Sequence, residues 1–352
     1  GFVNALGHFW NNWANWQSEI MLIVCGSATS WMVRNVIDNH GGLHDRITHE
    51  MHLHPFTLGE AEEFFHSNGF VWSRLSIIQA YMAIGGVPYY MSLFEKNDSP
   101  ATGLDRLFFS GNAELKKEYR RLFSSLFKNP QPYLEIISLL AKHPNGLTRD
   151  EISKKLNTSN NGRLGDMLTD LVYCDFLRKY NVREKKIKTN SSIYQLVDFY
   201  TIFYNTFTNK SIVEDNFWTR NVNTPEITAW YGLAFERLCK AHMSQIKSAL
   251  GISGVSAEFY TWKTNNIEGG AQIDIIIDRA DNTINLCEVK YCEDLYSLDK
   301  EEFLKIQNRI SAFKNVTGTR SSIIPTMITT FGMKNGMYSD QIISKLDMDA
   351  LF

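Results

Sequence analysis

Long apolar runs are missing from this sequence. No stretch approaches the roughly 18 apolar residues that a membrane-spanning helix needs, and no signal-peptide pattern occurs. We therefore expect a cytoplasmic protein with no membrane partner. Cysteines are also few: five occur among 352 residues, at scattered spacings and without a CxxC pair. This pattern argues against a disulfide scaffold and favours reduced thiols.

An excess of positive charge is absent as well. The formal net charge is −2, whereas a protein that binds nucleic acid over its whole surface is usually basic. Any such binding is therefore expected at local patches. Hydrophobic residues make up 44% and charged residues 21%, which is ordinary for a globular protein. The length exceeds what one hydrophobic core usually serves, so we predict an α/β multidomain protein.

The first 55 residues have the pattern of an α/β domain. A helix is predicted over 2–16, because aromatic residues recur there at helical spacing. The continuous apolar run Ile20–Cys25 predicts a strand buried on both faces, and 47–53 predicts a second strand. A further helix is expected over 31–38. The chain begins inside a predicted helix and without Met, so we expect a fragment of a longer protein.

Four further regions follow along the chain. Residues 56–128 are predicted to be a helical subdomain, in which Thr57 and Glu60 form a capping box at the first helix. Residues 129–198 are predicted to be a winged helix, and 199–225 an aromatic-rich helical connector. Residues 226–352 are expected to form a final α/β domain.

The expected winged helix is defined by the order of its elements. Three helices, then two strands, are predicted over 133–142, 148–156, 163–172, 176–180 and 193–197. A basic hairpin between the strands contains Lys185, Lys186 and Lys188, and Arg163 begins the third helix. These four residues are candidate contacts to DNA phosphates. Winged helices also serve as protein-binding modules, and Asp166, Asp170 and Asp175 dilute the positive charge.

The strongest chemical motif lies in the final domain. Two apolar runs, 270–278 and 284–290, are separated by a short polar stretch, which predicts a β-hairpin. Asp274 lies in the first run. Glu288 and Lys290 are two apart in the second, so they share one face of the strand.

This hairpin gathers charged groups among apolar residues. Burial of Asp274, Glu288 and Lys290 is costly unless they are compensated, and a divalent cation such as Mg²⁺ or Mn²⁺ would neutralise the carboxylates. Lys290 would orient or activate an attacking water, and Glu236 on the preceding helix would add a carboxylate. This is what metal-assisted phosphodiester hydrolysis requires. The alternative is a structural salt bridge of Lys290 with Glu288 or Asp274 in an inactive scaffold.

At these residues the sequence resembles the PD-(D/E)xK nuclease superfamily, which has the restriction-endonuclease-like fold. Asp274 matches its first acidic residue, Glu288-Val-Lys290 matches its E-x-K, and Glu236 matches the helix glutamate of many members. Ile273 stands where the superfamily often has proline. The resemblance implies a metal site at Asp274 and Glu288 and catalytic roles for Asp274, Glu288, Lys290 and Glu236.

The N-terminal part resembles a prokaryotic AAA-like P-loop ATPase family with a winged helix and a nuclease-like C-terminal domain. Leu22 to Met32 resembles the sensor-1 strand, and Gly41 to Leu58 resembles the segment that follows it. The resemblance implies that Ser27 or Thr29 contacts the γ-phosphate of ATP and that Arg46 is an arginine sensor or finger. No GxxxxGK[ST] occurs, so ATP and Mg²⁺ are expected to bind only together with an upstream part. Such ATPases also suggest a homo-oligomer.

These patterns lead to one functional hypothesis and two alternatives. The main one is an ATPase fragment coupled to a metal-dependent nuclease-like domain that acts on DNA. The second is a non-nuclease signalling ATPase of the STAND type, whose winged helix and last domain bind protein or DNA partners. The third is a winged-helix regulator with an accessory domain. His49, His52 and His54 form a further cluster that suggests a metal, but no fourth ligand is near in sequence, so surface histidines are the favoured interpretation.

Overall fold

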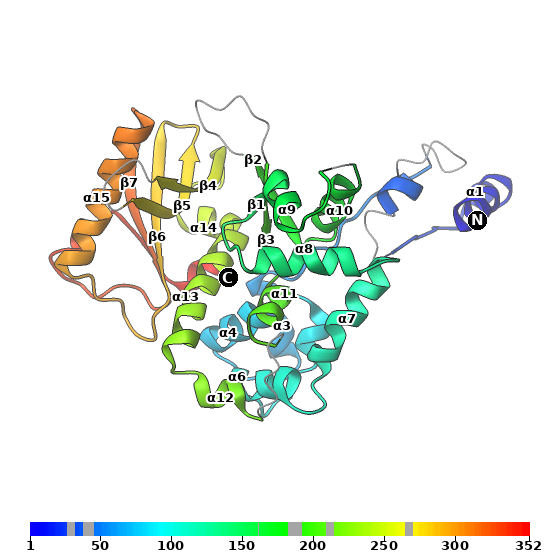
Figure 1. Cartoon of the computed structure of the whole chain (residues 1–352), viewed down its shortest axis with the longest axis horizontal. Coiled ribbons are helices and arrows are strands. Elements are labelled where there is room, and N and C mark those ends of the chain that lie inside the picture. The colour runs from blue at the N-terminus through cyan, green and yellow to red at the C-terminus, as the bar shows by residue number, and fades with distance from the viewer. Residues whose placement is uncertain (27–31, 38–45, 161, 182–191, 209–214, 265–269) are drawn as a thin grey trace. The chain divides into compact units, whose positions relative to one another are not determined.

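The computed structural model describes residues 1–26, 32–37, 46–160, 162–181, 192–208, 215–264 and 270–352. The chain is mixed α/β with two sheets, and it divides into two compact units (Figure 1). The first unit comprises 1–54 and 107–213, and the second comprises 55–106 and 214–352. The region 56–128, expected as one helical subdomain, thus contributes to both units. No helix in the described ranges is both long and apolar enough to cross a bilayer.

The predicted N-terminal helix is confirmed, but the two predicted strands are wrong. Helix α1 (Phe2–Asn12) is followed by the 3₁₀ turn η1 (Ala14–Trp16) and by a π-helical turn, η2 (Val33–Ile37). Residues 20–25 and 47–53 are not in strands, and their apolar side chains are mostly exposed. A buried strand needs neighbouring strands for its backbone hydrogen bonds, and neither segment pairs with a strand among the described residues.

The remainder of the first unit is close to the sequence prediction. Its elements are α7 (Glu114–Leu126), α8 (Gln131–Ala141), β1 (Leu147–Thr148), α9 (Arg149–Lys155), α10 (Gly162–Tyr173), β2 (Leu177–Asn181), β3 (Ser192–Leu196), α11 (Phe199–Phe203) and the π-helical turn η4 (Tyr204–Thr208). The strands form one antiparallel sheet in the order β1-β3-β2. Thr148 caps α9 through a capping box with Glu151.

Aromatic side chains form the core beside this sheet. Phe108, Tyr200, Phe203 and Phe207 are fully or almost fully buried, and Tyr119 stacks on Tyr204 with ring centroids 3.7 Å apart. The aromatic run after residue 198 is therefore a packing seam and leaves these rings little surface for base stacking. Burial of each such ring contributes a large share of the stability of a unit this size.

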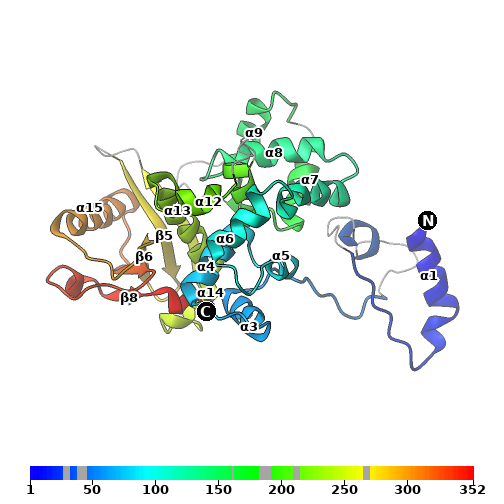
Figure 2. The same cartoon turned by 90° about the horizontal axis from the view of Figure 1, so that it is seen from below.

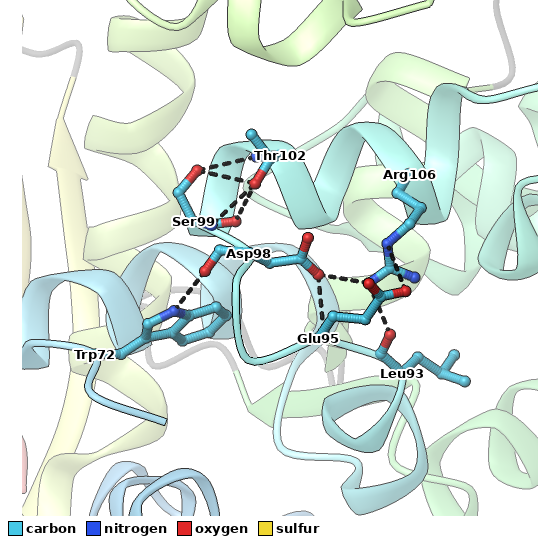
Figure 3. A network of polar contacts seen from close by, with 7 residues as sticks. All are labelled: Trp72, Leu93, Glu95, Asp98, Ser99, Thr102 and Arg106. Carbon is cyan, nitrogen blue, oxygen red and sulfur yellow. Dashed lines mark hydrogen bonds and ion pairs between the residues drawn. The ribbon is translucent and has the colours of Figure 1, made fainter. Parts of the chain in front are cut away.

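The helical part of the second unit begins with the capping box predicted at Thr57 and Glu60. Its helices are α3 (Leu58–Ser67), α4 (Arg74–Ile84), α5 (Pro88–Ser92) and α6 (Pro100–Leu104), and the π-helical turn η3 (Asp105–Phe109) leads into the first unit. Figure 3 shows how the loop before α6 is fixed. Arg106 bonds to the carboxylate of Asp98 and to the carbonyl of Leu93, and Trp72 donates to the carbonyl of Asp98 at 2.8 Å.

The second unit contains a five-stranded mixed sheet with helices on both faces. Its elements are α12 (Phe217–Asn221), α13 (Pro225–Ala241), α14 (Met243–Ala249), β4 (Ala257–Thr264), β5 (Ala271–Arg279), β6 (Thr283–Lys290), α15 (Lys300–Thr317), β7 (Ser322–Thr329), η5 (Ser339–Gln341), β8 (Ser344–Leu346) and η6 (Met348–Leu351). The strand order is β4-β5-β6-β7-β8, antiparallel up to β6 and parallel beyond it. Helix α15 covers one face and α13 the other (Figures 1 and 2).

The core of this sheet explains why α15 lies where it does. Apolar residues of β5 and β6 pack with the apolar stripe of α15, and the cluster includes Ile276, Leu286, Phe303, Ile306 and Ile310. Helix α15 joins the parallel strands β6 and β7, so it is the crossover of a βαβ unit and has to return across the sheet. The sequence analysis predicts the hairpin of β5 and β6 and the helix before it, α13, but not α14 or the short edge strand β8.

Candidate functional site

The predicted hairpin is confirmed, and it positions the motif residues. Strands β5 and β6 pair in antiparallel register from Ile275 opposite Cys287 to the turn, where Asn282 has a φ of 60°. A three-residue hairpin connection needs this left-handed conformation, which asparagine tolerates. The register brings Asp274 alongside Glu288, at the end of the hairpin away from the turn. One oxygen of Asp274 accepts a hydrogen bond from the backbone N–H of Val289 at 3.2 Å.

Glu288 is almost fully enclosed and is held by two cationic side chains. Its residue is 7% exposed. Oε1 lies 3.0 Å from Nζ of Lys290, and Oε2 accepts from Nη1 of Arg309 on α15. Burial of a carboxylate without such partners would be strongly unfavourable. The E-x-K pair is thus a real side-chain contact, and a third residue from a different element completes it.

Lys290 has a second acidic partner, Glu302, which lies on α15 as Arg309 does. Its Nζ lies 2.9 Å from Oε1 of Glu302. Burial opposes the charge of Lys290, but Glu288 and Glu302 outweigh that effect and raise its pKa. Lys290 is therefore protonated at neutral pH. It can orient a water or stabilise negative charge, but it cannot accept a proton as a general base.

Asp274 is the carboxylate of this group that has no ion pair among the described residues. Burial, together with the nearby carboxylates of Glu288 and Glu236, raises the pKa of Asp274 to about 7, against smaller opposing effects of the Val289 N–H and Lys240. Within the described residues, Asp274 makes no ion pair at 4.0 Å or less. Three carboxylates thus influence one another, and mutual repulsion is relieved by a proton or by a cation.

Glu236 approaches the same group from α13. It forms an ion pair with Lys240, one helical turn further along, and both side chains are about one-fifth exposed. Asp274, Glu288 and Glu236 do not have their carboxylate oxygens all within 4.8 Å of one another. The four residues predicted from the sequence are therefore gathered, but the three acids do not form a closed ligand cage.

The sequence analysis missed Glu302, Arg309 and Lys240. Glu302 and Arg309 are seven residues apart on α15, so they lie on one helix face with Ile306 between them. In the sequence, the signal for Glu302 and Arg309 was that charged residues flank the apolar stripe of the predicted helix. A shallow hollow lies next to this face, lined by Ile273, Leu286, Cys287, Glu288, Ile306, Arg309 and Ile310. Glu288 and Arg309 are its charged residues, and Asp274 does not line it.

Of the three ATPase-type candidates, the structure describes Arg46 alone. Ser27 and Thr29 lie outside the described residues, and Arg46 is exposed in a turn. Among the DNA-contact candidates, Lys185, Lys186 and Lys188 also lie outside the described residues, whereas Arg163 is exposed at the start of α10.

One aspartate of α10 has a different role from the one predicted. Asp170 is 7% exposed and accepts a hydrogen bond from the hydroxyl of Tyr133 at 2.7 Å. It therefore faces the core and does not dilute the charge of the exposed face. Asp166 is exposed, and Asp175 lies beyond the end of the helix.

The histidine cluster has an acidic neighbour that the sequence does not suggest. Nε2 of His52 and Nδ1 of His54 lie 3.3 and 3.4 Å from Oδ2 of Asp175. All three residues are exposed, so water compensates their charges and burial does not require a metal. His49 is exposed too, so the surface interpretation of these histidines agrees with the described structure.

No protein-family model, curated protein or solved structure matches the chain. The functional argument therefore rests on the chemistry of the residues themselves.

Proposed function

We propose that the unit formed by 55–106 and 214–352 is a metal-dependent nuclease of the PD-(D/E)xK type that acts on DNA. The observation that supports this most is Asp274, a largely buried carboxylate that repels two others and has no ion-pair partner in the described part of the chain. Such a group lowers stability unless something binds it, so it indicates a functional site rather than a structural one.

The donor set fits a small divalent cation. Mg²⁺ prefers carboxylate oxygens and keeps several waters, so Asp274 and Glu288 suffice as protein ligands and a closed cage is not needed. Glu236 would support them through water or through Asp274. When bound, the cation would supply Lewis-acid activation of a water and of the scissile phosphate.

The remaining residues have roles that follow from their charges. Lys290, held between Glu288 and Glu302, is a fixed positive charge that stabilises negative charge developing on the phosphate or orients the attacking water. Glu302 positions Lys290. Lys240 balances Glu236 and leaves Asp274 as the uncompensated acid.

Cleavage and cation binding test this function together. Wild type, Asp274→Ala and Lys290→Ala would be incubated with DNA in Mg²⁺ or Mn²⁺, and Mn²⁺ binding would be measured by calorimetry. We expect both variants to lose at least about 100-fold in cleavage rate, and Asp274→Ala to lose Mn²⁺ binding. Asp278→Asn, on the same strand, is the matched control and should cleave as wild type does. Equal cleavage by all four proteins would rule out the assignment.

A second candidate function is a binding unit of a STAND-type ATPase. It is favoured by the Arg309–Glu288 ion pair, which occupies an oxygen that a cation would need, and by the apolar lining of the hollow. In that case Mn²⁺ would not bind at all, and Asp274→Ala would leave calorimetry unchanged. The same experiment therefore separates the two functions.

For the first unit we propose a winged helix that contacts DNA. Three helices and an antiparallel sheet in the order β1-β3-β2 support it, together with the exposed Arg163. Neutralisation of Lys185, Lys186 and Lys188 should weaken DNA binding and reduce its salt dependence. Binding that is unaffected by these changes would argue for a protein-binding module.

The proposal of an ATPase-type N-terminal region rests on the sequence resemblance alone. The segments expected as strands are exposed and unpaired in the described structure, and the residues expected at the γ-phosphate are not described. Without a GxxxxGK[ST] loop we expect this chain not to bind ATP. Tight ATP binding measured by calorimetry would contradict that expectation.

A further inference from the structure

Arg309 is one of the charged residues of the proposed site that no motif includes. It lies on α15, and its side chain is 29% exposed, whereas the Glu288 side chain that it contacts is 9% exposed. The guanidinium therefore reaches from the solvent side to a buried carboxylate. It also borders the shallow hollow, whose lining is otherwise apolar apart from Glu288.

The two cations on Glu288 are held very differently. Lys290 is fixed on the same strand and has Glu302 as a second partner at 2.9 Å. Arg309 forms an ion pair with Glu288 alone among the residues that the structure describes. If a divalent ion binds Oε2 of Glu288, Arg309 is the residue that has to move, because no second ion pair within 4.0 Å holds it among the described residues.

A released guanidinium at this place has a natural ligand. A guanidinium carries five N–H donors in a planar fork, and Nη1 is the one that binds Glu288 here. That fork matches the oxygens of a phosphate diester, and it pairs with them in a bidentate manner. The hollow beside it offers no competing acid other than Glu288.

We propose that Arg309 is a phosphate-binding residue that closes onto Glu288 in the cation-free protein and turns to the DNA backbone once a divalent ion occupies Glu288. This inference rests on the proposed nuclease function. It makes the cation and the nucleic acid cooperate, because the ion releases the residue that binds the phosphate. Arg309 then competes with the cation and assists the substrate, two effects of opposite sign.

Opposite effects on two ligands provide the test. Mn²⁺ binding to Arg309→Gln and to wild type would be measured by calorimetry. Binding of a labelled 30-base-pair duplex would be measured by fluorescence anisotropy in Ca²⁺, a condition chosen so that wild type does not cleave the DNA. We expect Arg309→Gln to bind Mn²⁺ about fivefold more tightly, because a competing ion pair is gone. We expect it to bind the duplex about tenfold more weakly, with a log–log salt slope shallower by about 0.9.

Two further variants complete the experiment. Lys314→Gln removes an exposed positive charge from the same helix and should change neither titration. Arg309→Lys keeps the charge, so it should bind Mn²⁺ as wild type does and the duplex more weakly, since an ammonium lacks the bidentate fork. It also serves if the glutamine variant does not fold.

The failures are distinguishable. Wild type that binds Mn²⁺, with Arg309→Gln unchanged in both titrations, overturns the role of Arg309 and leaves the nuclease proposal standing. Arg309→Lys binding the duplex as tightly as wild type would likewise overturn the role of Arg309 and leave the nuclease proposal standing. Wild type that binds no Mn²⁺ overturns the nuclease proposal, and the role of Arg309 with it.

Discussion

Replacement of Asp274 by asparagine should stabilise the cation-free protein. Asparagine has nearly the same shape and keeps an oxygen that accepts from the N–H of Val289. It removes the charge that repels Glu288 and Glu236. The pKa of Asp274 is raised by burial and by these two acids to about 7, whereas an aspartate in an unfolded chain has a pKa near 3.8.

The direction of the effect with pH follows from this difference. A carboxyl whose pKa is raised on folding binds its proton more tightly when folded, so its stabilising effect is complete below about pH 4. It is lost as the pH rises through about 7. A difference of about three pH units corresponds to at most about 4 kcal/mol, lost between those limits. Wild type without a cation should therefore be less stable at pH 8 than at pH 5, and Asp274→Asn should not lose this stability.

Local hydrogen exchange is the suitable assay, because a chain of two units need not unfold in one step. Peptides that cover 271–290 would be followed in EDTA at pH 5 and pH 8, after correction for the intrinsic pH dependence of exchange. Wild type should lose protection at pH 8, and 1 mM MnCl₂ should restore it because an ion that binds only the folded state stabilises it. Asp274→Asn should keep its protection and gain none from Mn²⁺.

Two results would refute this reasoning. One is equal protection of wild type at the two pH values in EDTA, which would mean that Asp274 is not under electrostatic strain. The other is a matching effect in Asp278→Asn, the same substitution at the other aspartate of β5, which would show that removal of any charge from this strand stabilises it.

Two other carboxylates give predictions that do not depend on the nuclease site. Asp105 accepts from the N–H groups of Trp218 and Thr219, at 2.6 and 2.9 Å, and from the Thr219 hydroxyl. Asp105→Ala should cost about 2–4 kcal/mol in the second unit, seen as faster exchange over 215–224; unchanged exchange would contradict it. Asp198 caps α11 through the N–H of Thr201, and burial raises its pKa to about 6. Its stabilising effect is present below about pH 4 and is lost as the pH rises through about 6. Asp198→Asn keeps the cap, so it should be about 1–2 kcal/mol more stable than wild type at pH 7; the residue as a whole is only partly buried, which limits the gain. Denaturant unfolding of the first unit at pH 4 and 7 checks this, and equal stability of the two proteins at pH 7 would refute it.

The hairpin and its acids were predictable because their signals are local. Apolar runs of strand length, a polar turn with Asn282 and the two-residue spacing of Glu288 and Lys290 fix which side chains share a face. Once the hairpin forms, antiparallel register brings Asp274 alongside Glu288. No information from distant parts of the chain was needed for this part of the site.

The strand predictions at 20–25 and 47–53 failed for a physical reason. An apolar run shows that a segment would gain from burial, but it does not supply the neighbour that buries it. In the described structure Met21, Ile23 and Leu53 remain largely exposed. A strand depends on a sheet, whereas α1 satisfies its own backbone hydrogen bonds and therefore forms where the sequence predicts it.

The partners of Arg309 and Glu302 could not be predicted, because they depend on which sheet face α15 covers. The apolar stripe of α15 is visible in the sequence, but the strand beneath each of its turns is set by the crossover between β6 and β7. Only this pairing places Glu302 against Lys290 and Arg309 against Glu288.

The ion pairs of the completed site leave one acid unpaired among the described residues, and this distinguishes it from an ordinary set of salt bridges. Glu236 pairs with Lys240, Glu302 with Lys290 and Lys305, and Glu288 with both Lys290 and Arg309. Asp274 is the acid that is left without an ion pair, and it is largely buried. A scaffold that served only for stability would gain from an apolar or amide side chain there, because an unpaired buried carboxylate is costly. A site that binds a divalent ion needs that unpaired negative charge, since the ion brings two positive charges and Arg309 withdraws one when it leaves.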